Sequence, residues 1–189
     1  RDIGVTGVQT CALPIYPADV RVDIGPVIDA EARDGLEAHV AAMRAKGAHV
    51  TRLPLPAECA HGTFVAPTII EIGALAELGR EQFGPILHVL RYRAAELDGL
   101  IDAINASGYG LTMGVHTRID ETVERVAARA HVGNLYVNRN IIGAVVGVQP
   151  FGGEGLSGTG PKAGGPLYLH RLLARTPGPA LLDGALAVS

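Results

Sequence analysis

The stretch 133–166 carries the strongest chemical signal in the chain, because extended apolar runs alternate there with turns dense in glycine. Glycine lets a backbone pass close to a bound molecule, but it loses the most conformational entropy on folding, so this density is typical of a ligand loop. A flexible linker is the alternative. The apolar residues of the stretch disfavour a linker, which would be solvated: Leu135, Tyr136, Val137, Ile141, Ile142, Val145, Val146 and Phe151.

Three glycines of this stretch, Gly153, Gly155 and Gly158, fit the dinucleotide pattern G-x-G-x-x-G. That chemistry needs a helix opening at the end of the loop, so that a pyrophosphate meets the helix N-terminus. Pro161 and the glycines after it disfavour such a helix, and Lys162 follows a proline where the Walker pattern requires a glycine. We therefore expect these glycines to serve another purpose than cradling a phosphate.

Thiols and imidazoles are the other candidates for chemistry. The two cysteines, Cys11 and Cys59, form at most one disulfide, and their flanks lack the paired spacing of a metal site. We expect both to be reduced, and we expect no metal site. The 7 histidines are dispersed along the chain, which favours surface roles or local hydrogen bonds for each.

Composition narrows the function classes. The chain has 189 residues, 48% of them hydrophobic, and a formal net charge of −3, which suits one globular domain. No apolar run approaches the roughly 20 residues of a membrane-spanning helix, and we expect a cytoplasmic protein. The mild acidity and the dispersed lysines and arginines disfavour nucleic acid and favour a small-molecule partner.

The two ends of the chain differ from its middle. Residues 5–15 read VTGVQTCALPI, which matches the translation of a common sequencing-adapter primer. We expect residues 1–15 to be this artefact and the native sequence to begin near Tyr16; a genuine protein segment is the alternative. Residues 176–189 are apolar and punctuated by proline and glycine, and no structure is predicted for them.

Helices are predicted where apolar residues recur at a spacing of three and four. Asp29 and Asp120 are the expected N-caps, and Gly47 and Gly108 the expected C-terminal glycines. The helices span 29–46, 94–106 and 121–130, with one or two further turns in 74–81.

Strands are predicted where apolar and β-branched residues cluster, at 48–53, 63–72, 85–92, 111–117 and 133–138. Pro67 suggests an edge strand or a bulge, and the apolar run 85–92 suggests a buried strand. Strands that alternate with helices of this length predict an α/β fold with a mostly parallel sheet and flanking helices. Ligands of such sheets bind beyond the carboxyl ends of the strands.

Four blocks in order resemble the aldehyde dehydrogenase superfamily: TFVAPTIIE at 63–71, EQFGPILHV at 81–89, GNLYVNR at 133–139 and QPFGGEGLSGTG at 149–160. DIGPVIDAEA at 23–32 and the runs IIGAVVGVQPFGG and GTGPKAGGP resemble the L-glutamate γ-semialdehyde (Δ1-pyrroline-5-carboxylate) dehydrogenases, most of all the dehydrogenase module of bacterial bifunctional proline-utilisation proteins. The resemblance covers 19–173. It implies that residues 16–175 are the C-terminal part of an aldehyde dehydrogenase catalytic domain.

In that family a cysteine thiolate attacks the aldehyde, the thiohemiacetal gives hydride to NAD, and a glutamate-activated water hydrolyses the thioester. The family places this cysteine, this glutamate and its cofactor domain upstream of the block 23–32. The resemblance therefore implies that no catalytic residue lies in this chain and that the chain alone is inactive. The flanks of Cys59, PAECAHG, do not match the nucleophile motif. FAD is expected only if a proline dehydrogenase domain precedes this piece.

Five residues take roles by the same resemblance. Glu81 would accept hydrogen bonds from the nicotinamide ribose of NAD, and Phe83 would pack near the nicotinamide ring. Gly143 and Ala144 would bind the substrate carboxylate through backbone N–H groups, and Phe151 would line the aliphatic stem of the substrate. Without the motifs, these residues read as a solvated glutamate, buried aromatic residues and a turn glycine.

Two alternatives stay open. The chain could belong to a dehydrogenase of another aldehyde, for which the anchor at Gly143 and Ala144 would be useless. It could also be a non-catalytic dehydrogenase-like domain that supports assembly, which the presence of Glu81, Phe83 and Phe151 disfavours. Family members form oligomers, so the full-length protein is expected to be a homo-oligomer.

Overall fold

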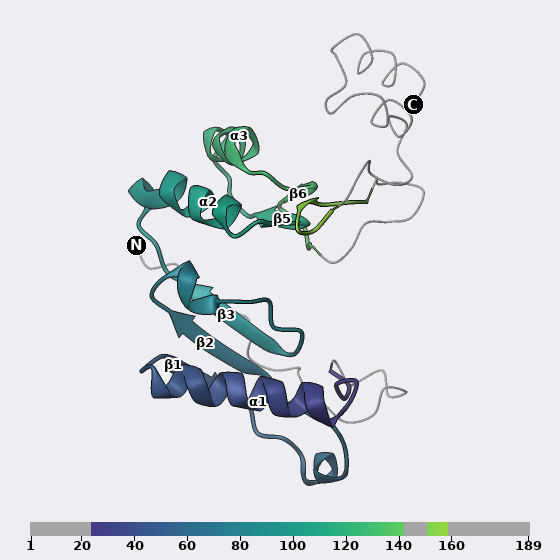
Figure 1. The fold of residues 1–189 in the computed structure, drawn as a ribbon. Coiled ribbons are helices and arrows are strands. Elements are labelled where there is room, and N and C mark those ends of the chain that lie inside the picture. The colour runs from purple at the N-terminus through teal and green to yellow at the C-terminus, as the bar shows by residue number, and fades with distance from the viewer. Residues whose placement is uncertain (1–23, 142–150, 159–189) are drawn as a thin grey trace. The chain divides into compact units, whose positions relative to one another are not determined.

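The computed structural model describes residues 24–141 and 151–158 (Figure 1). The chain divides into two compact units, of which the first ends at Arg91 and the second begins at Tyr92. We describe each unit by itself. Within the described residues, no helix has the length and apolarity needed to cross a bilayer.

The first helix among the described residues is α1 (Ala30–Ala45), as the sequence predicted. Asp29 is the N-cap, and its side chain accepts a hydrogen bond of 2.8 Å from the backbone N–H of Ala32. The helix ends where Gly47 takes a φ of 87°, a conformation that glycine adopts without steric cost. Both ends of α1 are thus set by local sequence.

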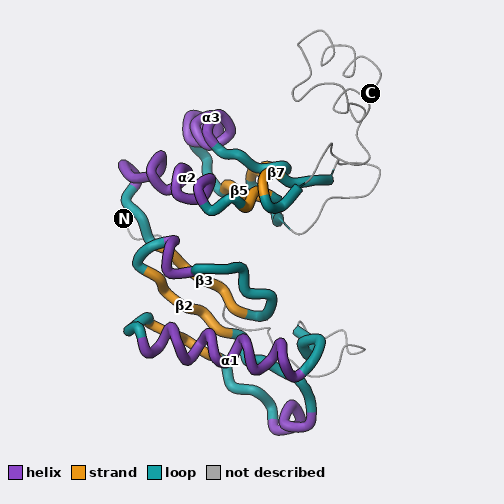
Figure 2. Tube along the Cα trace, in the orientation of Figure 1, coloured by secondary structure: helices purple, strands orange, loops and turns teal. Residues whose placement is uncertain are grey.

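A three-stranded sheet lies against α1, in the order β1 (His49–Arg52), β2 (Thr68–Ile72) and β3 (Ile86–Leu90) (Figures 1 and 2). The strand β2 pairs antiparallel with β1 and parallel with β3. Two short 3-10 helices, η1 (Ala57–His61) and η2 (Leu75–Leu78), lie in the connections. The core forms between helix and sheet from Val40, Met43, Ile70 and Ile72.

Two strand predictions for this unit were wrong in detail. Pro67 suggested an edge strand or a bulge, but β2 is the central strand and begins one residue after the proline. Proline lacks an N–H but keeps its carbonyl, and the Pro67 carbonyl accepts a hydrogen bond of 3.0 Å from Leu53. The strand β3 lies at the edge of the described sheet, and Leu87 is 51% exposed, so β3 is not fully buried.

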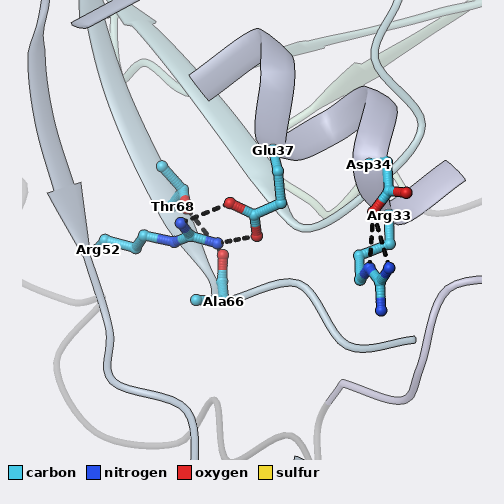
Figure 3. Close-up of polar contacts among 6 residues, drawn as sticks. All are labelled: Arg33, Asp34, Glu37, Arg52, Ala66 and Thr68. Atoms are coloured by element: carbon cyan, nitrogen blue, oxygen red, sulfur yellow. Dashed lines mark hydrogen bonds and ion pairs between the residues drawn. The ribbon is translucent and has the colours of Figure 1, made fainter. Parts of the chain in front are cut away.

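One polar contact joins a strand to the helix, and a second lies at the start of β2 (Figure 3). The Arg52 guanidinium, at the end of β1, donates to both carboxylate oxygens of Glu37 on α1, with Nη1 to Oε2 at 2.7 Å. Such a bidentate pair fixes geometry as well as charge. The buried Thr68 hydroxyl donates to the Ala66 carbonyl at 2.7 Å, so its burial leaves no unpaired donor.

The described part of the second unit, residues 92–141 and 151–158, contains two α-helices and two strand pairs. The strands β5 (Thr112–Val115) and β6 (Asn134–Val137) pair parallel, and β4 (Tyr109–Gly110) and β7 (Glu154–Gly155) pair antiparallel. The helix α2 (Leu97–Ala106) follows the 3-10 helix η3 (Ala94–Glu96), and α3 (Asp120–Arg129) joins β5 to β6. The parallel pairs β2–β3 and β5–β6 agree with the predicted α/β class.

Two exposed ion pairs connect α2 to α3. Arg125 donates to Asp98 at 2.6 Å, and Arg129 donates to both oxygens of Asp102 at 2.7 and 2.5 Å. These hydrogen bonds lower the pKa of each aspartate. The prediction that Asp120 caps α3 was wrong by one residue: the N-cap is Ile119, and Asp120 lies in the first turn, where a negative charge favours the helix dipole.

Replacing the cap of α1 should lower stability. We expect Asp29→Ala to reduce the free energy of unfolding by about 1 kcal/mol, because an N–H at the start of the helix loses its acceptor. Urea unfolding followed by far-ultraviolet circular dichroism measures this. The control Asp34→Ala removes an exposed carboxylate whose partner is the adjacent Arg33 and should change stability much less. Equal effects of the two substitutions would contradict the capping role.

Candidate functional site

Glu81 and Phe83 lie on the segment between η2 and β3 and face solvent. Phe83 is 80% exposed, and Glu81 is exposed as well. Within the described part of the chain, no hydrogen bond or ion pair engages the Glu81 carboxylate. Within the first unit, both side chains are therefore accessible to a ligand.

The elements that flank these two residues in sequence each make defined contacts. On the N-terminal side, the Glu77 carboxylate accepts hydrogen bonds from the backbone N–H groups of Gly73 and Ala74, at 3.0 and 2.8 Å. On the C-terminal side, Gly84 packs so closely on α1 that a β-carbon there would overlap the Leu36 side chain. The exposed residues thus lie in a connection between η2 and a glycine that packs on α1, and loops between regular elements are common places for binding residues.

Of the residues predicted to bind substrate, the structure describes one. Phe151 belongs to the second unit and is 43% exposed. Gly143 and Ala144 lie outside the described residues. Glu81 and Phe83 belong to the first unit, so the predicted contacts are divided between the two units.

A glycine-rich turn, residues 152–158, follows Phe151 and docks on the backbone of the same unit. The strand β7 in this turn pairs with β4, and the Leu156 N–H donates to the Gly108 carbonyl at 2.8 Å. The Ser157 hydroxyl accepts from the Gly110 N–H at 3.1 Å. Gly110 in turn accepts from the Gly133 N–H at 2.9 Å, which links the turn to the start of β6.

The glycines of this turn are explained by close backbone approach. A β-carbon on Gly133 would overlap the Gly152 carbonyl, and one on Gly158 would overlap the Gly153 carbonyl. Gly155 takes a φ of 59°, in the left-handed region. The pattern G-x-G-x-x-G therefore satisfies packing requirements of the chain itself.

Three successive backbone donors of the turn are also occupied. The N–H groups of residues 156, 157 and 158 donate to the carbonyls of Gly108, Glu154 and Gly155, at 2.8, 3.0 and 3.3 Å. A phosphate cradle needs successive N–H groups that point at the ligand. This turn directs three of them to protein carbonyls, which agrees with the expectation that it does not cradle a phosphate.

The carboxyl end of β6 carries a feature that the sequence reasoning missed. Asn138 takes a φ of 54°, and its amide both accepts from the Thr117 N–H at 3.0 Å and donates to the Thr117 carbonyl at 2.9 Å. Asparagine tolerates this left-handed conformation better than most residues. The next residue, Arg139, places its guanidinium 4.6 Å from the centre of the Tyr136 ring. The only signal in the sequence was the block GNLYVNR.

A model of the aldehyde dehydrogenase family matches residues 9–176, most of the chain. This chain belongs to the aldehyde dehydrogenase family. The match confirms the predicted family, and the fold neighbours below confirm the predicted fold class, a partial α/β domain of that family. The match to the family model begins at residue 9, inside the stretch 1–15. That this stretch is an artefact stays a prediction.

Relatives inside the family share much of the sequence. The bifunctional protein PutA of Klebsiella aerogenes is 63% identical over 166 residues, which cover 85% of this chain and 13% of that protein. A 1-pyrroline-5-carboxylate dehydrogenase of Bacillus cereus is 40% identical over 157 residues, 81% of this chain and 29% of that protein. The chain therefore spans a minor part of the length of these relatives.

A solved structure agrees with the sequence comparison. The crystal structure of a proline utilization A (PutA) mutant from Bradyrhizobium japonicum resembles this chain with a TM-score of 0.76 and 55% identity, covering 84% of this chain and 16% of that one. The two chains are thus similar in both fold and sequence.

Cys59 does not have the properties of an aldehyde dehydrogenase nucleophile. Its side chain is 4% exposed in η1, and burial, followed by the negative charge of Glu58, raises the pKa of its thiol. A nucleophilic cysteine needs a lowered pKa and access for the substrate. Among the described residues, no three histidine, cysteine or acidic side chains gather as metal ligands.

Enlarging a glycine of the turn should destabilise the second unit. We expect Gly158→Ala to cost roughly 1–3 kcal/mol of unfolding free energy, because its β-carbon meets a backbone carbonyl that cannot rotate away. Urea unfolding measures the change. The matched control is Gly99→Ala, in α2 of the same unit, where a β-carbon meets no atom within 4 Å and should stabilise the helix by about 0.5–1 kcal/mol. A neutral Gly158→Ala variant would refute the packing explanation.

The Cys59 thiol should react slowly in the folded chain. In a Cys11→Ser background, we expect modification by a disulfide reagent at pH 7 to be on the order of a hundredfold slower in buffer than in concentrated urea, because reaction requires local opening. Absorbance of the released thiolate gives the rate. Reaction in buffer as fast as in urea would show an accessible, reactive thiol and reopen a nucleophilic role for Cys59.

Proposed function

We propose that residues 16–175 belong to the C-terminal part of the catalytic domain of an NAD-dependent dehydrogenase that oxidises L-glutamate γ-semialdehyde to L-glutamate in proline catabolism. The observation that carries this proposal is the 63% identity with a PutA protein across 85% of this chain. The name 1-pyrroline-5-carboxylate dehydrogenase, borne by further relatives, supports the substrate. That compound is the cyclic form of the same semialdehyde.

The exposed residues of the first unit suit two contacts with NAD. The Glu81 carboxylate would accept hydrogen bonds from two vicinal ribose hydroxyls, a role for which an acceptor-only group is suited. The Phe83 ring would pack near the nicotinamide, and its 80% exposure leaves its surface available for that contact. Bound NAD supplies the hydride acceptor of the reaction.

The second unit supplies the contacts with the aldehyde substrate. Phe151 would line the aliphatic stem, and the docked turn behind it fixes where its backbone lies. Gly143 and Ala144, which lie outside the described residues, would bind the substrate carboxylate through backbone N–H groups. A carboxylate anchor distinguishes this substrate from neutral aldehydes.

The remaining catalytic groups belong, in this proposal, to other parts of a longer protein. A thiolate nucleophile and a general-base glutamate are needed for attack and hydrolysis. Cys59 does not qualify, because it is buried and its pKa is raised. The 189-residue chain alone should therefore show no turnover. We further propose a cytoplasmic homo-oligomer in its full-length form, with FAD only where a proline dehydrogenase domain is part of it.

A hybrid enzyme tests the proposal. Residues 16–175 would replace the matching segment of the Escherichia coli PutA protein, which is 62% identical to this chain over 178 residues. We expect the hybrid to reduce NAD with pyrroline-5-carboxylate, and we expect the 189-residue chain alone to be inactive. Turnover by the chain alone that is lost in Cys59→Ala would contradict the assignment of the nucleophile. A folded, inactive hybrid would contradict the proposed function.

Within the active hybrid, Glu81→Gln should lower kcat/KM for NAD by about tenfold, since the loss of a charged hydrogen bond to the ribose costs about 1.5 kcal/mol. Steady-state kinetics with varied NAD measures this. The matched control Glu124→Gln neutralises an exposed glutamate on α3 and should leave kcat/KM unchanged. Equal kinetics of the Glu81→Gln and wild-type hybrids would exclude the ribose contact.

A further inference from the structure

Two histidines from distant parts of the sequence meet in the first unit. His39 lies on α1 and His88 on β3, and their Nε2 atoms are 2.8 Å apart. The ring centres are 5.1 Å apart, with an angle of 68° between the ring planes. An N–H···N bond at this distance needs one ring to donate and the other to accept. One proton therefore lies between the two nitrogens.

The pair is one of two contacts between α1 and the chain that runs from Gly84 into β3. Leu36 lies three residues before His39 on the helix and packs against Gly84. His39 reaches His88 four residues further along the same segment. The helix thus holds the chain from residue 84 to residue 88, directly after Glu81 and Phe83.

The charges around the pair disfavour further protonation. Burial lowers the pKa of His39 most, and the positive charges of Lys46 at the end of α1 and of Arg80 beside Glu81 lower it further. Burial also lowers the pKa of His88, followed by the charge of His39.

The carboxylates of the neighbouring elements are engaged elsewhere. Glu37 on α1 binds Arg52 of β1, and Glu71 on β2 lies 3.7 Å from Arg91. On β1, the imidazole of His49 lies 3.4 Å from the Thr51 hydroxyl. None of these interactions places a negative charge on the histidine pair.

We propose that His39 and His88 are positioning residues that clamp β3 to α1, directly after Glu81 and Phe83 in the chain, and that the clamp opens in acid when both imidazoles are protonated. Two protonated rings would place two N–H donors and two positive charges face to face at 2.8 Å, with no acceptor between them. The clamp itself is independent of the proposed function. Only its consequence, weaker NAD binding in acid, rests on that function.

The sign of the pH effect follows from the lowered pKa of both rings. Imidazoles of the unfolded chain take up protons below a pH of about 6.5, before those of the folded chain do. The stabilising contribution of the pair is therefore complete above about pH 6.5 and is lost as the pH falls below it. For each pH unit of acidification, a histidine that takes up a proton only on opening can lower the ratio of closed to open clamp by up to about tenfold.

Nuclear magnetic resonance on the 189-residue chain gives the direct test. At pH 8 we expect a scalar coupling between the Nε2 nuclei of His39 and His88, which exists only across a hydrogen bond. Between pH 6.5 and 5, the coupling should disappear, and the amide protection factors of residues 84–90 should fall at least tenfold, with exchange corrected for its intrinsic pH dependence. Independent titration of the two rings near pH 6.5, without coupling, would overturn the proposal.

Variants separate the clamp from a general structural role. His88→Gln keeps a side chain that can donate to His39 or, after rotation of its amide, accept from protonated His39. We expect this variant to retain protection at pH 7.5 and to lose the pH dependence. His88→Leu should lower protection at every pH. The control His61→Gln changes an exposed histidine of η1 and should behave as wild type.

The comparison of wild type with His88→Gln decides the proposal even if His88→Leu fails to fold. The same pH dependence in both proteins would overturn it. None of these measurements requires activity, so a confirmed clamp in a chain whose hybrid enzyme is inactive would refute the proposed function alone.

Discussion

The close approach of backbone to backbone in the glycine turn is the constraint on which the second unit depends. The turn docks on the start of β6 so closely that a β-carbon has no room at Gly133, and its own fold leaves no room for one at Gly158. Carbonyl and N–H groups that approach this closely must be hydrogen-bonded, and the turn meets this requirement with bonds to Gly108 and within itself. Phe151, which begins this docked segment, is thereby held half-exposed at the surface.

In the first unit, a helix packs beside the segment that follows the exposed residues. In the proposed function Glu81 and Phe83 face a ligand, yet they lie in a connection without regular structure. The helix α1 supplies the support, through the contact of Leu36 with Gly84 and through the histidine pair. In both units, then, the exposed residues of the proposed site are next in sequence to backbone that packs on a regular element.

The elements that the sequence predicted well are those set by local signals. The helix α1 has an aspartate cap, a glycine end and an apolar face, and each of these acts within a few residues. The family blocks around Glu81 and Phe151 were recognisable in the same way. Asp120 was misjudged because an acidic residue suits both the cap and the first turn of a helix, and sequence alone does not separate the two.

The features that escaped prediction depend on tertiary contacts. The strand β7 has no β-branched residue and pairs only because β4 offers a docking edge. Pro67 precedes a central strand because β1 and β3 pair with β2 on either side, and this pairing is not visible in the local sequence. His39 and His88 are 49 residues apart, and the local roles expected for histidines gave no sign of their contact. Gly143 and Ala144 lie outside the described residues, so their role rests on the family resemblance.

The central claim is that this segment of an aldehyde dehydrogenase serves an aldehyde that bears a carboxylate. The most direct test is the ratio of kcat/KM for glutamate semialdehyde to kcat/KM for a neutral aldehyde of the same chain length, measured in the hybrid that carries residues 16–175. The account predicts a ratio of at least about a hundred, since anchoring a carboxylate by charged hydrogen bonds contributes about 3 kcal/mol. A ratio near one would contradict it.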